Sequence, residues 1–241
     1  MKRYLIFIFI LSLWSCSKKN DAAVVPVVPA ITATAPPIAQ KDSVSYLALG
    51  DSYTYGFGAP QNMSYPNQLA SLLRGQNYYA ANPIVIAQFG WTAGDLLNGI
   101  AASNVTRKFD FVTILIGVND QNKGTNTETY TQKMNQLLGV AVAYAHGYAN
   151  RVFVISIPDW SVTPYAANLD KAKISAGIDL FNTINQEQCK KFGANYLDIS
   201  ALSALAATDA TLTSTDGLHP SAKMYSLWAN QFLSKVIATF N

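Results

Sequence analysis

The stretch FVTILIG, residues 111–117, is apolar at almost every position and ends in a glycine. A strand with one face in water alternates apolar and polar side chains, whereas a strand covered on both faces is a continuous apolar run. Strands of the second kind belong to parallel sheets with helices packed on both sides. We therefore expect a parallel sheet whose interior includes Phe111–Gly117.

Outward from this stretch, short apolar runs alternate with segments that have helical spacing. The other four expected strands are Val44–Gly50, Ile84–Gly90, Arg151–Ile157 and Asn195–Ile199. The five expected helices are Tyr65–Gly75, Thr92–Ser103, Thr127–Tyr148, Asp170–Phe192 and Ser221–Phe240. This alternation predicts an α/β fold of flavodoxin-like type: a three-layer α/β/α sandwich with a five-stranded parallel sheet, in one domain over residues 44–241.

The composition excludes several classes of protein. Half of the 241 residues are hydrophobic and only 13% are charged, which excludes a disordered chain and a coiled coil. The 17 Lys and Arg residues against 14 Asp and Glu residues give a formal net charge of +3, too small for a nucleic-acid partner. Two histidines and two cysteines in the whole chain argue against a structural zinc site.

The first 15 residues have the pattern of a signal peptide. Lys2 and Arg3 precede the apolar run Tyr4–Trp14, which is too short to cross a bilayer, because a spanning helix needs about 20 residues. The run ends in LWSC, residues 13–16, which resembles the lipobox of bacterial lipoproteins, although Trp14 is bulkier than usual. The resemblance implies export and a lipidated Cys16 that anchors the protein to a membrane of the bacterial cell envelope. The alternative is an ordinary secretory signal with an incidental cysteine.

Residues 16–43 are expected to form a tether between the lipid-anchor cysteine and the domain. The segment holds four of the ten prolines, Pro26, Pro29, Pro36 and Pro37. Proline at this density disfavours helix and sheet pairing and favours an extended chain. We expect a stalk that holds the domain away from the membrane surface.

Two polar residues follow expected strands at the edge where ligands bind in such sheets, beyond the carboxyl ends of the strands. Ser52 follows the first strand in GDSYTYG, residues 50–56, where backbone N–H groups can stabilise an oxyanion beside a nucleophilic hydroxyl. Asn119 follows the third strand and can donate its side-chain amide to a developing negative charge. Each has a simpler explanation, since serine also caps helices and asparagine favours turns.

His219 is the candidate base, in the motif DGLHP at residues 216–220. A serine nucleophile needs a group that takes its proton, and histidine is the usual one. Asp216 stands three residues earlier and can accept a hydrogen bond from the far ring nitrogen, which fixes the tautomer. The alternative is a helix-capping Asp216 beside a surface His219.

Together, four motifs in this order resemble the SGNH hydrolase superfamily, the GDSL-type esterases and lipases. The matching residues are Gly50-Asp51-Ser52 with Tyr53 in place of the leucine, Gly90, Gly117-Val118-Asn119-Asp120 and Asp216-Gly217-Leu218-His219-Pro220. The resemblance covers residues 44–241, which is the whole expected domain.

The resemblance implies a role for each matching residue. Ser52 is the expected nucleophile, His219 the general base and then acid, and Asp216 the carboxylate that orients it. The expected oxyanion hole consists of the Ser52 amide, the Gly90 amide and the Asn119 side chain. The implied reaction is hydrolysis of a carboxylic ester through an acyl-enzyme, with no metal or organic cofactor.

Aromatic residues close to these motifs are the candidates for substrate contacts: Tyr53, Trp91 and Trp160. Aromatic rings stack on sugar rings or line acyl pockets, and equally serve as core or loop packing. No long apolar lid is visible in the sequence, which favours short acyl esters or acetylated carbohydrate esters. Two other functions stay open: a glycoside hydrolase with its acids among Asp120, Asp159 and Asp216, or a non-catalytic surface binding protein on the same scaffold.

Overall fold

Five parallel strands form the central sheet, in the order β4-β2-β5-β6-β7. The computed structural model describes residues 34–241, so the expected signal peptide and Cys16 lie outside the described residues. The strands are β2 (Tyr46–Gly50), β4 (Ile84–Ala87), β5 (Phe111–Leu115), β6 (Val152–Ile155) and β7 (Asn195–Leu197). The predicted five-stranded parallel sheet is confirmed, and each strand lies within its predicted range.

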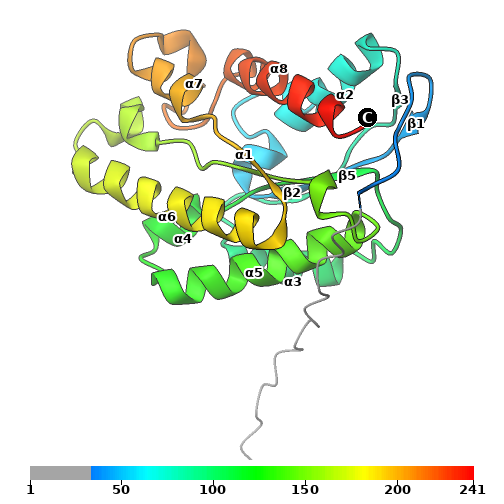
Figure 1. Cartoon of the computed structure of the whole chain (residues 1–241). Helices are drawn as coiled ribbons and strands as arrows, with labels where there is room; N and C mark the ends of the chain where they lie inside the picture. The colour runs from blue at the N-terminus through cyan, green and yellow to red at the C-terminus, as the bar shows by residue number, and fades with distance from the viewer. Residues whose placement is uncertain (1–33) are drawn as a thin grey trace, which may run out of the picture.

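Helices cover both faces of this sheet, which confirms the predicted three layers (Figure 1). One face carries α2 (Tyr65–Gly75) and α8 (Ala222–Ala238), and the other carries α3 (Ala93–Ala102), α5 (Thr127–Tyr144) and α6 (Lys171–Phe192). Three shorter helices, α1 (Ser52–Tyr55), α4 (Val118–Asn122) and α7 (Ser200–Ala204), follow strands β2, β5 and β7. None of the helices in the described residues is long and apolar enough to cross a membrane.

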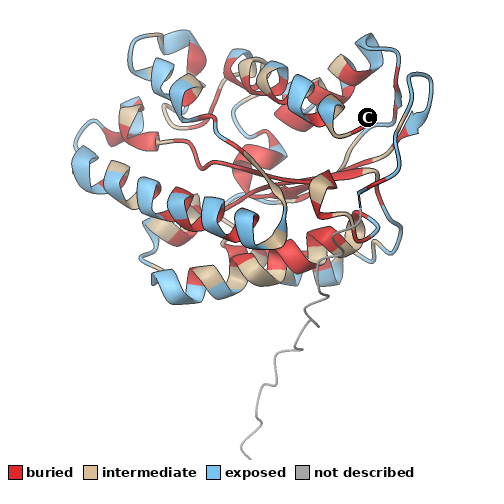
Figure 2. Ribbon diagram, in the orientation of Figure 1, coloured by how far each residue is buried: buried red, intermediate tan, exposed pale blue. Residues whose placement is uncertain are grey.

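The side chains of β5 alternate between two apolar clusters, one on each face of the sheet. Val112 and Ile114 pack with the layer of α3, α5 and α6, whereas Phe111 and Leu115 pack with the layer of α2 and α8. Every residue of the strand is buried, and Figure 2 shows the sheet buried between helices whose outer surfaces are exposed. Burying one large apolar side chain contributes about 1.5–3 kcal/mol, so coverage of both faces stabilises the centre of the fold.

The predicted strand Val44–Gly50 is divided into two parts at Ser45. The backbone N–H and the hydroxyl of Ser45 donate hydrogen bonds of 2.7 and 2.6 Å to the carboxylate of Asp110. Before this point, β1 (Ser43–Val44) pairs with β3 (Tyr79–Ala80) in a separate two-stranded parallel sheet. The bonds to Asp110 therefore mark where the chain passes from the small sheet into the central one.

The long helix α5 ends earlier than its predicted limit at Tyr148. The chain leaves the helix after Tyr144, because His146 and Gly147 take left-handed φ angles of 56° and 88°. A left-handed residue stops the right-handed hydrogen-bond pattern, and glycine adopts this conformation without steric cost.

The described part of the expected tether lies against the domain. Ala35 is buried, the carbonyl of Pro36 accepts a 2.6 Å hydrogen bond from Arg151, and the Ile38 N–H donates to the carbonyl of Phe240 at 2.6 Å. Contacts of the domain therefore begin before Val44.

Gly50, the last residue of β2, has no space for a side chain. A Cβ atom there would lie 2.1 Å from Thr54 Oγ1 and 2.2 Å from the carbonyl oxygen of Leu115. The second contact is with the backbone of the neighbouring strand β5, which cannot move without disturbing the sheet. Gly50 thus lets α1 fold back directly over the end of the sheet.

We predict that Gly50→Ala lowers the free energy of unfolding by about 1–3 kcal/mol or more, because the added methyl overlaps a strand backbone. Gly75→Ala is the matched control: Gly75 ends α2, its added methyl meets nothing within 4 Å, and stability should stay equal or rise slightly. Urea unfolding followed by circular dichroism measures both. Equal effects of the two substitutions would contradict the packing argument.

Candidate active site

Ser52 is fixed by the tight turn between β2 and α1. Asp51 caps the helix, since its Oδ1 accepts a 3.0 Å hydrogen bond from the Tyr53 N–H. The Asp51 N–H in turn donates to the carbonyl of Leu115 on β5, at 3.3 Å. These bonds place Ser52 at the carboxyl end of the central strands, where it is 4% exposed.

Ser52, His219 and Asp216 form one continuous chain of contacts. The Oγ of Ser52 lies 3.0 Å from Nε2 of His219, a residue 167 positions later in the sequence. The other ring nitrogen, Nδ1, lies 2.6 Å from Oδ2 of Asp216. The structure thus brings together the three residues that the sequence analysis selected for nucleophile, base and orienting carboxylate.

Asp216 is held by hydrogen bonds on both oxygens. Its Oδ1 accepts from Ser214 Oγ at 2.7 Å, from the Leu218 N–H at 2.8 Å and from the His219 N–H at 2.9 Å. Partial burial raises the pKa of this carboxyl, but the hydrogen bonds from Ser214, the backbone and the His219 ring outweigh it and hold the pKa well below its ordinary value. Asp216 is therefore a fixed negative charge beside the imidazole.

The loop that carries His219 is closed by backbone pairing. Thr213 and Pro220 form an antiparallel bridge, and the Ser214 N–H donates to the carbonyl of His219 at 2.8 Å. Gly58 lies against this loop with a left-handed φ of +89°, and a Cβ atom there would lie 2.9 Å from the Cβ of His219. Only glycine permits so close an approach at this backbone angle.

Gly90 and Asn119 border the same site from the two strands that flank β2. Gly90 follows β4 with a φ of +78°, and Asn119 is the second residue of α4 after β5. The Asn119 side chain donates to the carbonyl of Trp91 at 2.9 Å, and Lys123 Nζ donates to the carbonyl of Gly90 at 3.2 Å. Within the described part of the chain, neither the Ser52 N–H nor the Gly90 N–H finds an acceptor. Both amides therefore have a free donor at the site.

A cavity of about 330 Å³ opens over Ser52 and His219. Two residues that line it, Phe89 and Tyr165, are 58% and 59% exposed, whereas Tyr53 and Trp160 line it almost fully buried, at 2% and 6%. Sequence reasoning missed Phe89 and Tyr165 as lining residues. A signal existed for Phe89, because it directly precedes the expected oxyanion residue Gly90.

Trp91 lies outside this cavity. Its indole packs on Gly99 of α3, where an added Cβ would lie 2.1 Å from the ring. The residue directly after Gly90 thus turns toward the helix layer. Trp91, expected from the sequence to contact substrate, packs against α3 and does not line the cavity.

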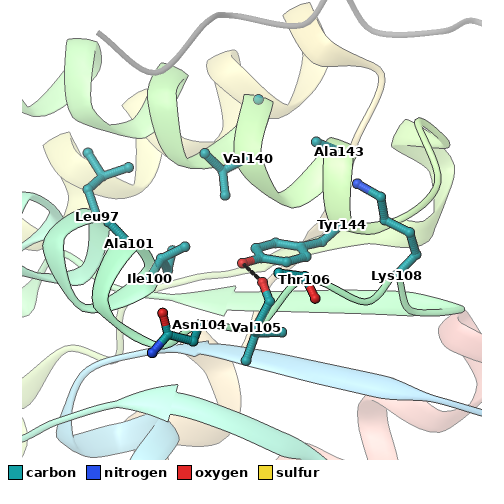
Figure 3. Close-up of a pocket in the computed structure, with 11 residues that line it drawn as sticks. Leu97, Ile100, Ala101, Asn104, Val105, Thr106, Lys108, Val140, Ala143 and Tyr144 are labelled. Atoms are coloured by element: carbon teal, nitrogen blue, oxygen red, sulfur yellow. Dashed lines mark hydrogen bonds between the residues drawn. The ribbon is translucent and has the colours of Figure 1, made fainter. Parts of the chain in front are cut away.

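A larger cavity of about 590 Å³ lies elsewhere, between α3 and α5 (Figure 3). Its lining is mostly aliphatic, with the Tyr144 hydroxyl donating to the carbonyl of Val105 at 2.9 Å and with Lys108 at one end (Figure 3). No Ser, His, Asp or Glu is among the residues that line it. The groups able to carry out hydrolysis gather at the smaller cavity.

Two of the three carboxylates proposed for a glycoside hydrolase are engaged elsewhere, and the third, Asp216, is bound to His219. Asp120 accepts from the Ala93 N–H at 2.8 Å, and Asp159 accepts from the Ser161 N–H and the Ser175 hydroxyl at 2.9 and 2.7 Å. No Asp or Glu is among the residues lining the cavity over Ser52. Among the described residues there is also no cluster of three or more His, Cys, Asp or Glu side chains that could hold a metal ion.

Comparison with protein-family models finds one match, the GDSL-like Lipase/Acylhydrolase family, over residues 48–227. The chain belongs to this family. Proteins of the GDSL-like family hydrolyse esters, so this protein is a hydrolase of ester substrates. A comparison with curated protein sequences finds no match.

Solved structures share the fold of this GDSL-like hydrolase. A psychrotrophic esterase, EstA from Pseudoalteromonas sp., is 18% identical with a TM-score of 0.62, and the match covers 80% of this chain and 96% of that one. An acetyl xylan esterase from Geobacillus stearothermophilus is 17% identical with a TM-score of 0.58, covering 80% and 94%. A two-domain esterase active on acetylated mannans is 15% identical with a TM-score of 0.62, covering 83% of this chain and 50% of that one.

Two buried carboxyl groups lie beneath the site of the GDSL-like hydrolase. Asp51 is fully buried, and its Oδ2 has no hydrogen-bond partner among the described residues. Burial raises the pKa of Asp51 to about 8 against the lowering effect of the Tyr53 N–H, and the charge of Asp120 raises it further. Burial likewise raises the pKa of Asp120 to about 6. Asp51 is thus neutral in the folded protein at pH 7.

We predict that stability falls as the pH rises from about 4 to about 8, in part through Asp51. Its pKa is 3.8 in the unfolded chain and about 8 in the fold, so within this window the folded protein keeps a proton that unfolding releases. The side chain of Asp51→Asn cannot ionise, so the variant escapes this loss of stability. Between pH 4 and pH 9, the free energy of unfolding of Asp51→Asn minus that of the wild type should therefore increase by more than about 1.4 kcal/mol, the equivalent of one pKa unit.

Urea unfolding at the two pH values tests this, with Asp179→Asn, an exposed carboxyl on α6, controlling for the lost negative charge. A difference between wild type and Asp51→Asn that is the same at both pH values would contradict the raised pKa.

Proposed function

We propose that this protein is a serine esterase in which Ser52 is the nucleophile, His219 the general base and acid, and Asp216 its orienting carboxylate. The observation that carries the proposal is the chain of contacts from Ser52 Oγ to His219 Nε2 at 3.0 Å and from His219 Nδ1 to Asp216 Oδ2 at 2.6 Å. A hydroxyl, an imidazole and a carboxylate in this order form the constellation that activates a serine for acyl transfer.

The first half of the reaction forms an acyl-enzyme. Ser52 Oγ attacks the ester carbonyl carbon while its proton passes to Nε2 of His219, giving a tetrahedral intermediate with a negative oxygen. As the bond to the alcohol oxygen breaks, His219 returns the proton to that oxygen and the alcohol leaves. The Asp216 carboxylate stabilises the imidazolium throughout, and its bond to Nδ1 keeps Nε2 directed at Ser52.

The second half restores the enzyme. Water attacks the acyl carbon while one of its protons passes to Nε2 of His219, and the new tetrahedral intermediate collapses. The bond to Ser52 Oγ breaks, Oγ takes the proton from His219, and the carboxylic acid is released. No other reactant is required.

The proposed oxyanion hole consists of the Ser52 N–H, the Gly90 N–H and the Asn119 side-chain amide. Its support is that the two backbone amides lack acceptors within the described residues and border the same cavity as Asn119. Asn119 gives one N–H to the Trp91 carbonyl, which orients the amide and leaves its second N–H for the substrate. One such donor contributes about 10²–10³ in turnover.

Short acyl esters and acetylated carbohydrate esters are the proposed substrates. The cavity is open at Phe89 and Tyr165, and such a surface does not enclose a long acyl chain. The names of two structural neighbours point the same way, since one is an acetyl xylan esterase and another is active on acetylated mannans. An acetyl group on a sugar therefore fits both the opening of the site and the neighbours.

We predict that Ser52→Ala lowers hydrolysis of p-nitrophenyl acetate by at least about 10³-fold, because it removes the nucleophile, and Asp216→Asn by about 10³–10⁴-fold, because the imidazole loses the carboxylate that orients it. Ser71→Ala, which changes an exposed serine on α2, is the control and should match the wild type. Initial rates and circular dichroism of the purified proteins provide the measurement. Full activity in Ser52→Ala would remove the nucleophile assignment, and an inactive wild type would favour the binding-protein alternative.

We also propose that the protein is exported and anchored to the bacterial cell envelope through a lipidated Cys16. The support is the sequence alone: the apolar run Tyr4–Trp14 followed by Ser15-Cys16.

In a bacterial host, we predict that Cys16→Ser abolishes incorporation of radiolabelled palmitate and moves the protein from the membrane fraction to the soluble fraction. The thioether-linked lipid needs the cysteine sulfur, which serine lacks. Unchanged labelling, or no labelling of the wild type, would leave an ordinary secretory signal as the explanation of residues 1–15.

A further inference from the structure

Two exposed phenylalanines lie against the ring of His219. Phe57 follows α1 and Phe89 follows β4, and their ring centroids are 5.1 Å apart. The centroid of the His219 ring lies 4.8 Å from Phe57 and 5.8 Å from Phe89. The two rings come from distant parts of the chain and meet at the reacting group.

The fold does not need these two rings for its core. Phe57 is 42% exposed and Phe89 58% exposed, whereas the inner side of His219 is already covered by the buried ring of Tyr53 at 5.7 Å. The backbone of Phe57 is fixed, with its N–H donating to the Ser52 carbonyl at 2.9 Å and its carbonyl accepting from the Tyr225 hydroxyl at 3.0 Å. The backbone that carries one of the two rings is thus fixed, and both rings are exposed to water beside the base. Exposed apolar surface at a site marks a place where a ligand binds.

The chemistry of the reaction decides which part of an ester meets this surface. If Ser52 and His219 act as proposed, His219 Nε2 must hand its proton to the departing alcohol oxygen, so the alcohol part of the ester lies beside the His219 ring. We propose that Phe57 and Phe89 form a subsite for the alcohol part of the substrate, and that this part is a pyranose ring of an acetylated carbohydrate. The subsite rests on the proposed esterase function.

The half-exposed position of the rings favours a sugar over an alkyl alcohol. A pyranose presents apolar C–H groups on one face and hydroxyls around its edge, so it can cover an aromatic ring while its hydroxyls stay in water. An alkyl chain gains most binding free energy when it is completely enclosed, and rings that are 42% and 58% exposed do not enclose it. Asn122 and Lys123 line the cavity together with Phe89 and supply donors for hydroxyl groups.

The test compares two acetate esters that share the acyl group and differ in the alcohol: methyl acetate and tri-O-acetylated methyl xylopyranoside. We expect Phe57→Ala and Phe89→Ala each to lower the ratio of kcat/KM for the sugar ester to kcat/KM for methyl acetate by about tenfold, the size of one aromatic contact. Phe89→Leu, which keeps apolar area and loses the ring face, should lower the ratio as well. Tyr79→Ala, an aromatic on β3 that is 65% exposed, is the control and should leave the ratio unchanged.

Two outcomes would overturn the subsite while the esterase function stands. Equal losses of kcat/KM for both esters would mean that the rings only support His219. A ratio lowered by Phe89→Ala but not by Phe89→Leu would mean that the subsite binds an alkyl alcohol.

A binding measurement separates failure of the subsite from failure of the esterase function. Calorimetric titration of Ser52→Ala with the acetylated xyloside should give an affinity about tenfold higher than that of Ser52→Ala/Phe89→Ala. Equal affinities overturn the subsite even if the wild type hydrolyses neither ester, and that inactivity would itself refute the proposed function.

Discussion

The site depends on how closely α1 approaches the end of β5. The Leu115 carbonyl accepts from the Asp51 N–H at 3.3 Å and from the Thr54 hydroxyl at 3.4 Å, so one backbone oxygen holds both ends of the turn that carries Ser52. Gly50 makes this approach possible, because any side chain there would overlap that same oxygen. Since β5 also leads into Asn119, the proposed nucleophile and one proposed oxyanion donor are fixed relative to each other through Leu115.

This geometry requires polar groups to be buried at the end of the sheet. Asp51 and Asp120 lie beneath the site, and each accepts a hydrogen bond from the backbone N–H of a nearby helix: that of Tyr53 in α1 and that of Ala93 in α3. Burial raises the pKa of both carboxyls, so keeping them ionised is unfavourable. The apolar clusters on the two faces of the sheet offset that cost.

The fold is predictable from the sequence because its signals are local. Parts of the site are not predictable, because they depend on contacts between residues far apart in the sequence. The apolar run Phe111–Leu115 indicates a strand buried on both faces without any knowledge of its neighbours. The break at Ser45, in contrast, depends on Asp110, which lies 65 residues away. The order of the motifs, not periodicity, pairs Ser52 with His219. Phe89 and Trp91 both adjoin Gly90 in the sequence, and this adjacency does not separate Phe89, which lines the cavity, from Trp91, which packs on α3.

The two sides of His219 are built differently, and this separates the reaction from the choice of substrate. On the inner side, Asp216, Gly58 and the buried ring of Tyr53 fix the imidazole through short bonds and close packing. On the outer side, Phe57 and Phe89 extend from loops, and little else in the protein constrains their side chains. With His219 as the proposed base, we expect changes on the inner side to disturb proton transfer for every ester, and changes on the outer side to alter only what lies beside the departing oxygen. A hydrolase with this arrangement can adapt to a new alcohol through loop residues while its proton-transfer geometry stays fixed by the sheet.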